Sequence, residues 1–380
     1  MNFATLALIC AVAILGPVMS LQRWSLPVVL GELLVGLVLG ATGLGVLHAD
    51  DPTFTFLAQI GFALVMFVTG THIPLRSPDL RAGLSQGILR ALAIGALAVP
   101  AGLGIAALFG TGHGWLYAVL IASSSAALVM PALAGLPLTA PSIVAMLPQI
   151  AIADTACIVL LPLAIDPANA TRAGLGAAAV LAAGVPVYLF LRRAQRSGAR
   201  RRMHDVSEDR GLALELRVTL TLLFGLAALA VFVHVSIMLA GFVLGLIVAA
   251  VGEPHRLAHQ AFALTEGFFG PVFFVWLGAS LDLTKVVERP EALALGLVLG
   301  AGAAVVHASM ALTGQPLPVA AATAGQLGVP VAAATLGTTL GLLGPGEDAA
   351  LLLGALVTIA VLAVVNRSLV RIAGAGPAPP

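Results

Sequence analysis

The sequence predicts an all-α membrane protein built from many transmembrane helices. Of its 380 residues, 60% are hydrophobic and 9% are charged, which is outside the range of an ordinary soluble domain. Apolar runs of about 20 residues, each long enough to cross a ~30 Å hydrocarbon layer, recur between short polar stretches. A transmembrane β-barrel would instead show alternating segments of about ten residues. The net charge of +1 gives no indication of a nucleic-acid partner.

Thirteen apolar runs are expected to span the bilayer. The first has no basic residue before it, so we interpret it as a retained span rather than a cleaved signal. Basic residues gather in alternate loops, and because cytoplasmic loops collect them, we expect the N-terminus outside and the C-terminus in the cytoplasm. The basic loop 192–210 separates the two halves and is interpreted as a solvated cytoplasmic anchor. The expected spans are 2–20, 27–46, 54–72, 85–109, 114–134, 142–165, 171–191, 211–233, 235–252, 259–281, 291–312, 317–343 and 347–366.

The two halves of the chain contain matching segments. LPVVLGELLVGLVLG in the second span matches SIMLAGFVLGLIVA in the ninth, which places Gly36 opposite Gly245. The end of the third span matches the end of the tenth, which places Gly70 opposite Gly278. Both matches displace the chain by seven spans, and because seven is odd the second copy enters the membrane upside down. The sequence therefore predicts an inverted repeat, an architecture typical of secondary transporters.

Paired helix-breaking residues occur in two spans related by this repeat. The fifth span contains Ser123, Ser124 and Ser125 followed by Pro131, and the twelfth contains the stretch 325–330, which ends in a proline. Proline removes a backbone donor and glycine relaxes the backbone, so each helix is expected to be interrupted. We predict two crossed, discontinuous helices whose free backbone groups face a cavity near the middle of the bilayer.

Asp154 lies at the centre of the sixth span. A central aspartate costs roughly 2.5 to 3.5 kcal/mol on insertion scales, so such a residue usually faces a wet cavity or a partner. Its carboxylate can bind a proton or a metal cation, and protonation removes the charge that attracts the cation. That competition is the minimum chemistry for exchange. Ser124, Ser125 and Gln326, on the two broken helices, are the candidate residues for completing the ion site around Asp154.

Two further ionisable residues lie in the apolar spans. His307 is the titratable side chain of the eleventh span, and it is either a switchable charge opposite Asp154 or a hydrogen-bonded core residue. Glu32 lies about one turn inside the cytoplasmic end of the second span. It is a candidate for lining an access vestibule, and it could equally reach the membrane interface.

The segments LPVVLGELLVGLVLG, FLAQIGFALVMFVTG, SSSAALVMPAL, the helix around Asp154 and GPVFFVWLGASLDL resemble, in that order, the cation/proton antiporter superfamily. The similarity is to the monovalent cation:proton antiporter-2 branch, which holds bacterial sodium/proton exchangers and potassium-efflux transporters. It implies that Asp154 is the ion-binding aspartate of a homodimeric bacterial inner-membrane protein that exchanges Na⁺ or K⁺ for H⁺ by an elevator movement. It also implies one membrane domain over 1–380, with core helices at about 85–165 and 291–366 and dimer-domain helices at about 1–72 and 211–281.

The sequence departs from the family pattern at two positions. Ala153 stands where relatives commonly carry Asp, Asn or Gln, and His307 stands where they commonly carry Lys or Arg. These changes leave the stoichiometry and the cation open. We expect no regulatory domain after the last span, no cofactor and no enzymatic activity, since no metal-ligand cluster or nucleophile–base pair is evident. The alternatives are a sodium-coupled symporter of organic solutes and a membrane sensor or subunit that does not transport.

Overall fold

All regular elements of the described chain are helical, as the sequence predicted. The computed structural model describes residues 1–21, 28–71, 78–126, 128–129, 133, 140–199, 202–203, 206–207, 210, 212–252, 255–281, 284 and 289–374. Its longer elements are α1 (Phe3–Ala13), α2 (Leu15–Leu21), α3 (Val28–Leu39), α4 (Pro52–Thr71), α5 (Pro78–Phe109), α6 (Gly114–Ala122), α8 (Pro141–Ile165), α9 (Ala170–Arg196), α11 (Leu214–Phe232), α12 (Ile237–Val251), α13 (His255–Leu264), α14 (Gly270–Ser280), α16 (Pro290–Ala308), α17 (Leu317–Ala322), α18 (Gly328–Thr339) and α19 (Glu347–Gly374). Three short turns complete them: η1 (Pro167–Asn169), η2 (Thr265–Phe269) and η3 (Ser309–Thr313).

Within the described residues, eight helices are long and apolar enough to cross a bilayer. Two shorter apolar segments, Phe3–Val18 and Ile237–Val251, accompany them. The chain is therefore a polytopic helical membrane protein. The expected number of thirteen spans stays a prediction, because the expected fifth and twelfth spans are present as helices too short to count by length alone. α6 has nine residues, and the twelfth span is divided between α17 and α18.

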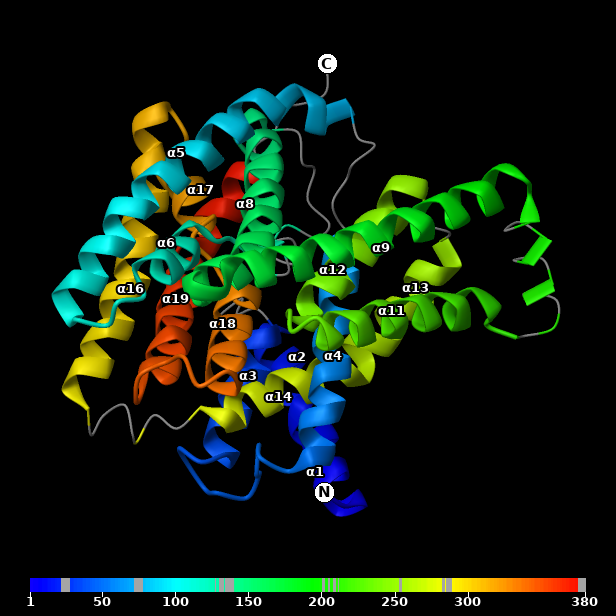
Figure 1. Ribbon diagram of the computed structural model, residues 1–380, viewed down its shortest axis with the longest axis horizontal. Coiled ribbons are helices and arrows are strands. Elements are labelled where there is room, and N and C mark those ends of the chain that lie inside the picture. Colours follow the sequence, from blue (N-terminus) through cyan, green and yellow to red (C-terminus); the bar gives the residue numbers. More distant parts are fainter. Residues whose placement is uncertain are drawn as a thin grey trace.

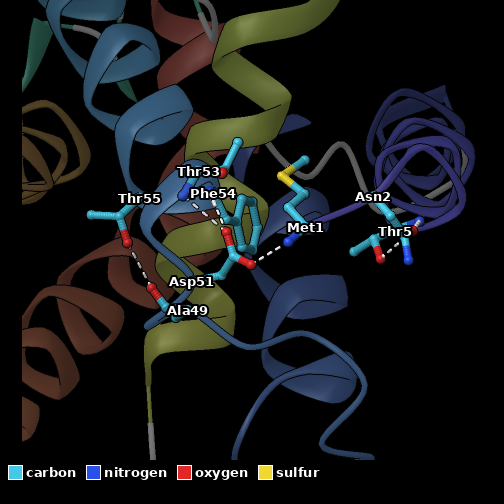
Figure 2. Close-up of polar contacts among 8 residues, drawn as sticks. All are labelled: Met1, Asn2, Thr5, Ala49, Asp51, Thr53, Phe54 and Thr55. Carbon is cyan, nitrogen blue, oxygen red and sulfur yellow. Dashed lines mark hydrogen bonds and ion pairs between the residues drawn. The ribbon is translucent and has the colours of Figure 1, made fainter.

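Polar side chains form hydrogen bonds that fix the loop before α4. The Asp51 carboxylate accepts hydrogen bonds from the backbone N–H groups of Thr53 and Phe54, at 2.9 and 3.1 Å, and so caps the first turn of the helix. The amino group of Met1 also contacts this carboxylate, which ties α1 to the same loop (Figure 2). The Thr55 hydroxyl donates to the carbonyl of Ala49 at 2.8 Å. Together these bonds fix the connection that precedes α4.

The glycines matched across the repeat meet in two equivalent contacts. Gly36 of α3 packs on Gly278 of α14, where a Cβ built at Gly278 would lie 2.9 Å from the Gly36 Cα atom. Gly70 of α4 packs in the same way on Gly245 of α12, with the corresponding distance 2.8 Å. Since the repeat relates Gly36 to Gly245 and Gly278 to Gly70, one contact is the repeat image of the other. This pairing is what an inverted repeat requires.

The helices pack in two groups. α5, α6, α8, α16, α17, α18 and α19 pack on one another and occupy the left of the view, whereas α1, α2, α3, α4 and α14 lie lower and to the right (Figure 1). α12 packs on α4 in the second group. α9 contacts both α8 and α12, and it runs beside α11 to the far right of the view (Figure 1). α9 therefore connects the two groups.

The first half-helix is anchored to the start of α19. The Tyr117 hydroxyl donates to Oε1 of Glu347 at 2.5 Å, and Nδ1 of His113 lies 2.7 Å from the same oxygen. The backbone N–H of Gly344 donates to the other carboxylate oxygen at 2.8 Å. Glu347 is the first residue of α19, where a negative charge is favourable against the helix dipole. These bonds hold α6 at the end opposite to its break.

Candidate ion-binding site

The two interrupted helices meet at their breaks. α6 ends at Ala122, and residues 123–125 are extended or irregular; α17 ends at Ala322, and α18 starts at Gly328. The Ser124 hydroxyl donates to the backbone carbonyl of Thr323 at 2.6 Å, and the Ser123 hydroxyl donates to Oε1 of Gln326 at 2.6 Å. The prediction of discontinuous helices is therefore confirmed, and their breaks are joined by hydrogen bonds.

Proline and glycine residues explain the position of the second break, between α17 and α18. Pro330 lies in the first turn of α18, where its missing N–H removes no helical hydrogen bond, so it starts the second half-helix instead of interrupting it. Gly325 and Gly328 flank the open segment. Pro131, the corresponding residue of the first broken helix, lies outside the described residues.

Asp154 projects from the middle of α8 toward the first break. Its side chain is buried, and its Oδ2 atom accepts a hydrogen bond from the backbone N–H of Ala126 at 3.4 Å. No side chain of the described residues forms an ion pair with this carboxylate. Ala153, its neighbour on the helix, is buried and adds no polar atom. The carboxylate thus lies in the protein interior with one long hydrogen bond, an arrangement that requires a proton or a cation for neutrality.

Ser125 is the serine whose hydroxyl is free to act as a ligand. Its side chain is buried, and its hydroxyl makes no hydrogen bond with the described residues. Its carbonyl accepts from the backbone N–H groups of Leu128 and Val129, which resume helical structure after the break. The hydroxyls of Ser123 and Ser124 are already engaged. Ser125 directly precedes Ala126, which bonds Asp154, and its role in ion binding stays a prediction.

His307 fastens the two half-helices together. It is fully buried in α16, with Nδ1 2.8 Å from the Thr323 hydroxyl and Nε2 3.1 Å from the carbonyl of Ile121. A carbonyl only accepts, so Nε2 carries a hydrogen. Both ring nitrogens are thereby occupied, and in the described chain no ion pair connects His307 with Asp154. The role of His307 as a switchable partner of Asp154 stays a prediction, whereas its position shows it bridging the C-terminal ends of α6 and α17.

A chain of neutral polar groups extends from His307 into the core. Gln149 of α8 donates to the Thr323 hydroxyl at 3.3 Å, and Gln315 donates to Gln149 Oε1 at 3.1 Å. On the other side, the backbone N–H of Gln326 donates to the Thr358 hydroxyl of α19 at 3.3 Å. Sequence reasoning missed Thr323 and Thr358, since a lone threonine in an apolar helix has no distinguishing pattern. The recurrence of Gln and Thr between positions 313 and 326 was the available signal.

A crevice between the two groups of helices approaches the second break. One cavity of about 270 Å³ is lined by Gln59 and Trp276 of the second group and by Thr335 of α18, and it extends to Val331 and Ala332. A neighbouring cavity of about 160 Å³ shares with it His234, Leu336 and Leu340.

Two methionines lie against Gly328, the first residue of α18. A Cβ at Gly328 would lie 3.3 Å from the sulfur atoms of both Met66 and Met238. These flexible side chains therefore pack against the start of α18.

Glu32 does not belong to this cluster. It projects from α3 into a separate cavity, together with Glu266 of η2 and residues of α1, α2 and α14. Its proposed place on an access pathway stays a prediction. Within the described residues there is no group of three or more His, Cys, Asp or Glu side chains that could hold a metal ion.

Fold and site together define an all-helical membrane protein in which two interrupted helices lie beside a buried carboxylate that forms no ion pair within the described part of the chain. Residues 10–365 match the family model described as sodium/hydrogen exchanger, transmembrane. The chain belongs to that family.

Individual proteins agree with this assignment. YjbQ of Bacillus subtilis strain 168, whose name assigns it provisionally as a Na(+)/H(+) antiporter, is 26% identical over 308 residues, covering 76% of this chain and 49% of YjbQ. The glutathione-regulated potassium-efflux system protein KefC of Salmonella newport strain SL254 is 29% identical over 316 residues, covering 79% of this chain and 48% of KefC. The chain thus spans about half the length of the curated relatives it matches. The solved structure of the sodium proton antiporter MjNhaP1 of Methanocaldococcus jannaschii superposes with a TM-score of 0.70 at 15% identity, covering 98% of both chains, and so shares the fold.

Proposed function

We propose that this protein exchanges a monovalent cation, Na⁺ or K⁺, for H⁺, and that Asp154 carries the two ions in turn. The observation behind the proposal is the Asp154 carboxylate, buried in α8 with one hydrogen bond and no cationic partner in the described chain. A carboxylate in that setting is stable when it is protonated or when it binds a cation. Exchange follows because the two states exclude one another.

The surrounding groups suit a small cation. Beside Asp154, the break of α6 offers the Ser125 hydroxyl and backbone groups that no helical bond uses. Oxygen ligands of this kind are what alkali cations prefer, and broken helices provide them at the centre of many transporters. Ser124 and Gln326 support the site indirectly, because their hydrogen bonds hold the two breaks together. His307 fixes the half-helices in the same way.

Access to the site alternates, in our proposal, by movement of one group of helices against the other. The core is formed by helices within about 85–165 and 291–366, and the group within about 1–72 and 211–281 stays still and forms the contact between two copies. The crevice beside α18 supports this division, since it lies between the two groups. In the same proposal, the protein lies in a bacterial inner membrane with its N-terminus outside and its C-terminus in the cytoplasm.

The test is exchange in proteoliposomes that contain a pH-sensitive dye. Addition of Na⁺ or K⁺ should move protons in the wild type, and Asp154→Asn should abolish that movement because the amide cannot release a proton or carry a charge. Asp50→Asn is the matched control, since Asp50 is exposed in the loop before α4. Retained exchange in Asp154→Asn would refute the mechanism. Solute uptake without proton movement would indicate the symporter, and cation binding without flux the sensor.

A further inference from the structure

A pair of carboxylates lines a cavity in the group of helices that does not contain Asp154. The cavity measures about 140 Å³, enough for several water molecules. Glu32 of α3 and Glu266 of η2 line it, together with Cys10 of α1, and the other lining residues are apolar or glycine. None of the lining residues comes from α6, α8, α17 or α18. The cavity is therefore distinct from the site at the two breaks.

Glu32 is the buried member of the pair. Its side chain is 4% exposed, and no described residue gives its carboxylate a hydrogen bond or an ion pair. Helix α2 packs closely on the Glu32 side chain, since a Cβ at Gly16 would lie 2.8 Å from the Glu32 Cγ atom. Gly31 packs equally closely on the Gly16 backbone. Close contact between α2 and α3 thus confines the Glu32 side chain on one side, and the side chain lines the cavity.

Glu266 lies at the rim of the same cavity. It belongs to the π-helical turn η2, which interrupts the regular helix between α13 and α14. A π-helical turn widens the backbone by one residue and is often found where a side chain serves a function. This turn places Glu266, Gly267 and Phe268 together on the cavity wall. Glu266 is exposed, so the two carboxylates of this cavity differ in their access to the surface.

Two carboxylates around one small, mostly apolar cavity repel each other. No positively charged side chain of the described chain lines the cavity. A buried carboxylate without a partner is costly, and a second one nearby raises that cost. The buried carboxylate of Glu32, with a second carboxylate nearby, is therefore favoured when it is protonated or binds a cation.

We propose that Glu32 and Glu266 form a second cation-binding site, in which a monovalent cation and protons compete. Among the described residues that line the cavity, two carboxylates alone supply side-chain oxygens, which is few for Ca²⁺ with its six to eight oxygen ligands. An ion bound between Glu32 and Glu266 connects α3 with η2, and thereby stabilises the packing of α1 and α14 around them. The proposal does not depend on the transport role of Asp154.

The experiment uses Asp154→Asn as the background, so that the first site cannot contribute. Thermal unfolding of the purified protein is measured at pH 8 in NaCl, in KCl and in choline chloride of equal ionic strength. Since a ligand that binds only the folded state stabilises it, we expect the unfolding temperature to rise by about 2 °C or more with Na⁺ or K⁺ over choline. Adding Glu32→Gln or Glu266→Gln should remove the rise. The control Glu291→Gln, at an exposed position in the first turn of α16, should keep it.

Proton release provides a second reading. Addition of Na⁺ or K⁺ to weakly buffered Asp154→Asn should lower the pH of the solution, and Glu32→Gln should suppress that release. Size-exclusion chromatography checks that each Gln variant is folded, and Glu32→Asp offers a charged replacement if the Gln variant is not.

Absence of any cation effect in Asp154→Asn would overturn the proposal, as would an effect that survives Glu32→Gln. A response to Ca²⁺ alone would overturn the assignment to monovalent ions. Transport by the wild type is measured separately, so a failure of the exchange mechanism cannot be mistaken for a failure of this site.

Discussion

At the scale of single residues, Asp51 shows how one carboxylate couples local structure to pH. The hydrogen bond from the Met1 amino group, followed by the one from the backbone of Phe54, lowers the pKa of Asp51 below its ordinary value. A carboxyl with a lowered pKa in the folded state stabilises the fold above its unfolded pKa, and this stabilisation is lost as pH falls through the folded pKa. The contribution is therefore complete at neutral pH and disappears in acid, below about pH 4.

Replacement of Asp51 by asparagine tests this dependence. Asparagine caps a helix about as well as aspartate but does not titrate in this range. We expect the unfolding temperature of Asp51→Asn to fall less than that of the wild type between pH 7 and pH 3, measured by thermal unfolding in detergent. Asp50→Asn, next to it and exposed, should follow the wild type. Identical pH profiles for Asp51→Asn and the wild type would contradict the role given to the carboxylate.

At the scale of helices, the contact between Gly70 and Gly245 sets how closely α4 and α12 approach. A Cβ at Gly245 would lie 2.2 Å from the Phe67 carbonyl oxygen, so Gly245→Ala forces the two backbones apart. Such overpacking typically costs about 1–3 kcal/mol. Gly225→Ala in α11 is the control, because a Cβ there meets nothing within 4 Å. It should leave stability unchanged or raise it by up to about 1 kcal/mol, since alanine favours a helix. Thermal unfolding measures the stability of both variants. If Gly245→Ala is as stable as Gly225→Ala, the contact at Gly245 does not limit how closely α4 and α12 approach.

The same helices show how far the sequence predicts the structure. Matching Gly36 with Gly245 and Gly70 with Gly278 predicted the repeat, because close backbone contacts tolerate no side chain. The interruptions were predicted at Ser123 to Ser125 with Pro131, and at 325–330; the structure has them at 123–125 and 323–327, with Pro330 inside the helix that follows. The partners of those breaks were not predicted, because hydrogen bonds such as those from His307 to Thr323 and Ile121 join helices far apart in the chain. Pairing of that kind depends on tertiary packing, which local sequence does not encode.

At the scale of the whole molecule, the proposed movement of one group of helices past the other predicts that a bridge across the crevice blocks exchange. Gln59 of α4 and Thr335 of α18 line it from opposite groups and are both exposed. The background is a Cys10→Ser, Cys157→Ala variant that still exchanges. In it, Gln59→Cys with Thr335→Cys should lose exchange after treatment with a reducible thiol cross-linker, and reduction should restore it.

The control pair is Ala41→Cys with Ser280→Cys. Both positions are exposed and lie within one group, where the Ala41 N–H donates to the Ala279 carbonyl at 3.3 Å. Cross-linking this pair leaves the crevice free and should leave exchange intact. If exchange continues in molecules that gel analysis shows to be bridged between positions 59 and 335, the two groups do not need to move at this crevice, and access to Asp154 must open elsewhere.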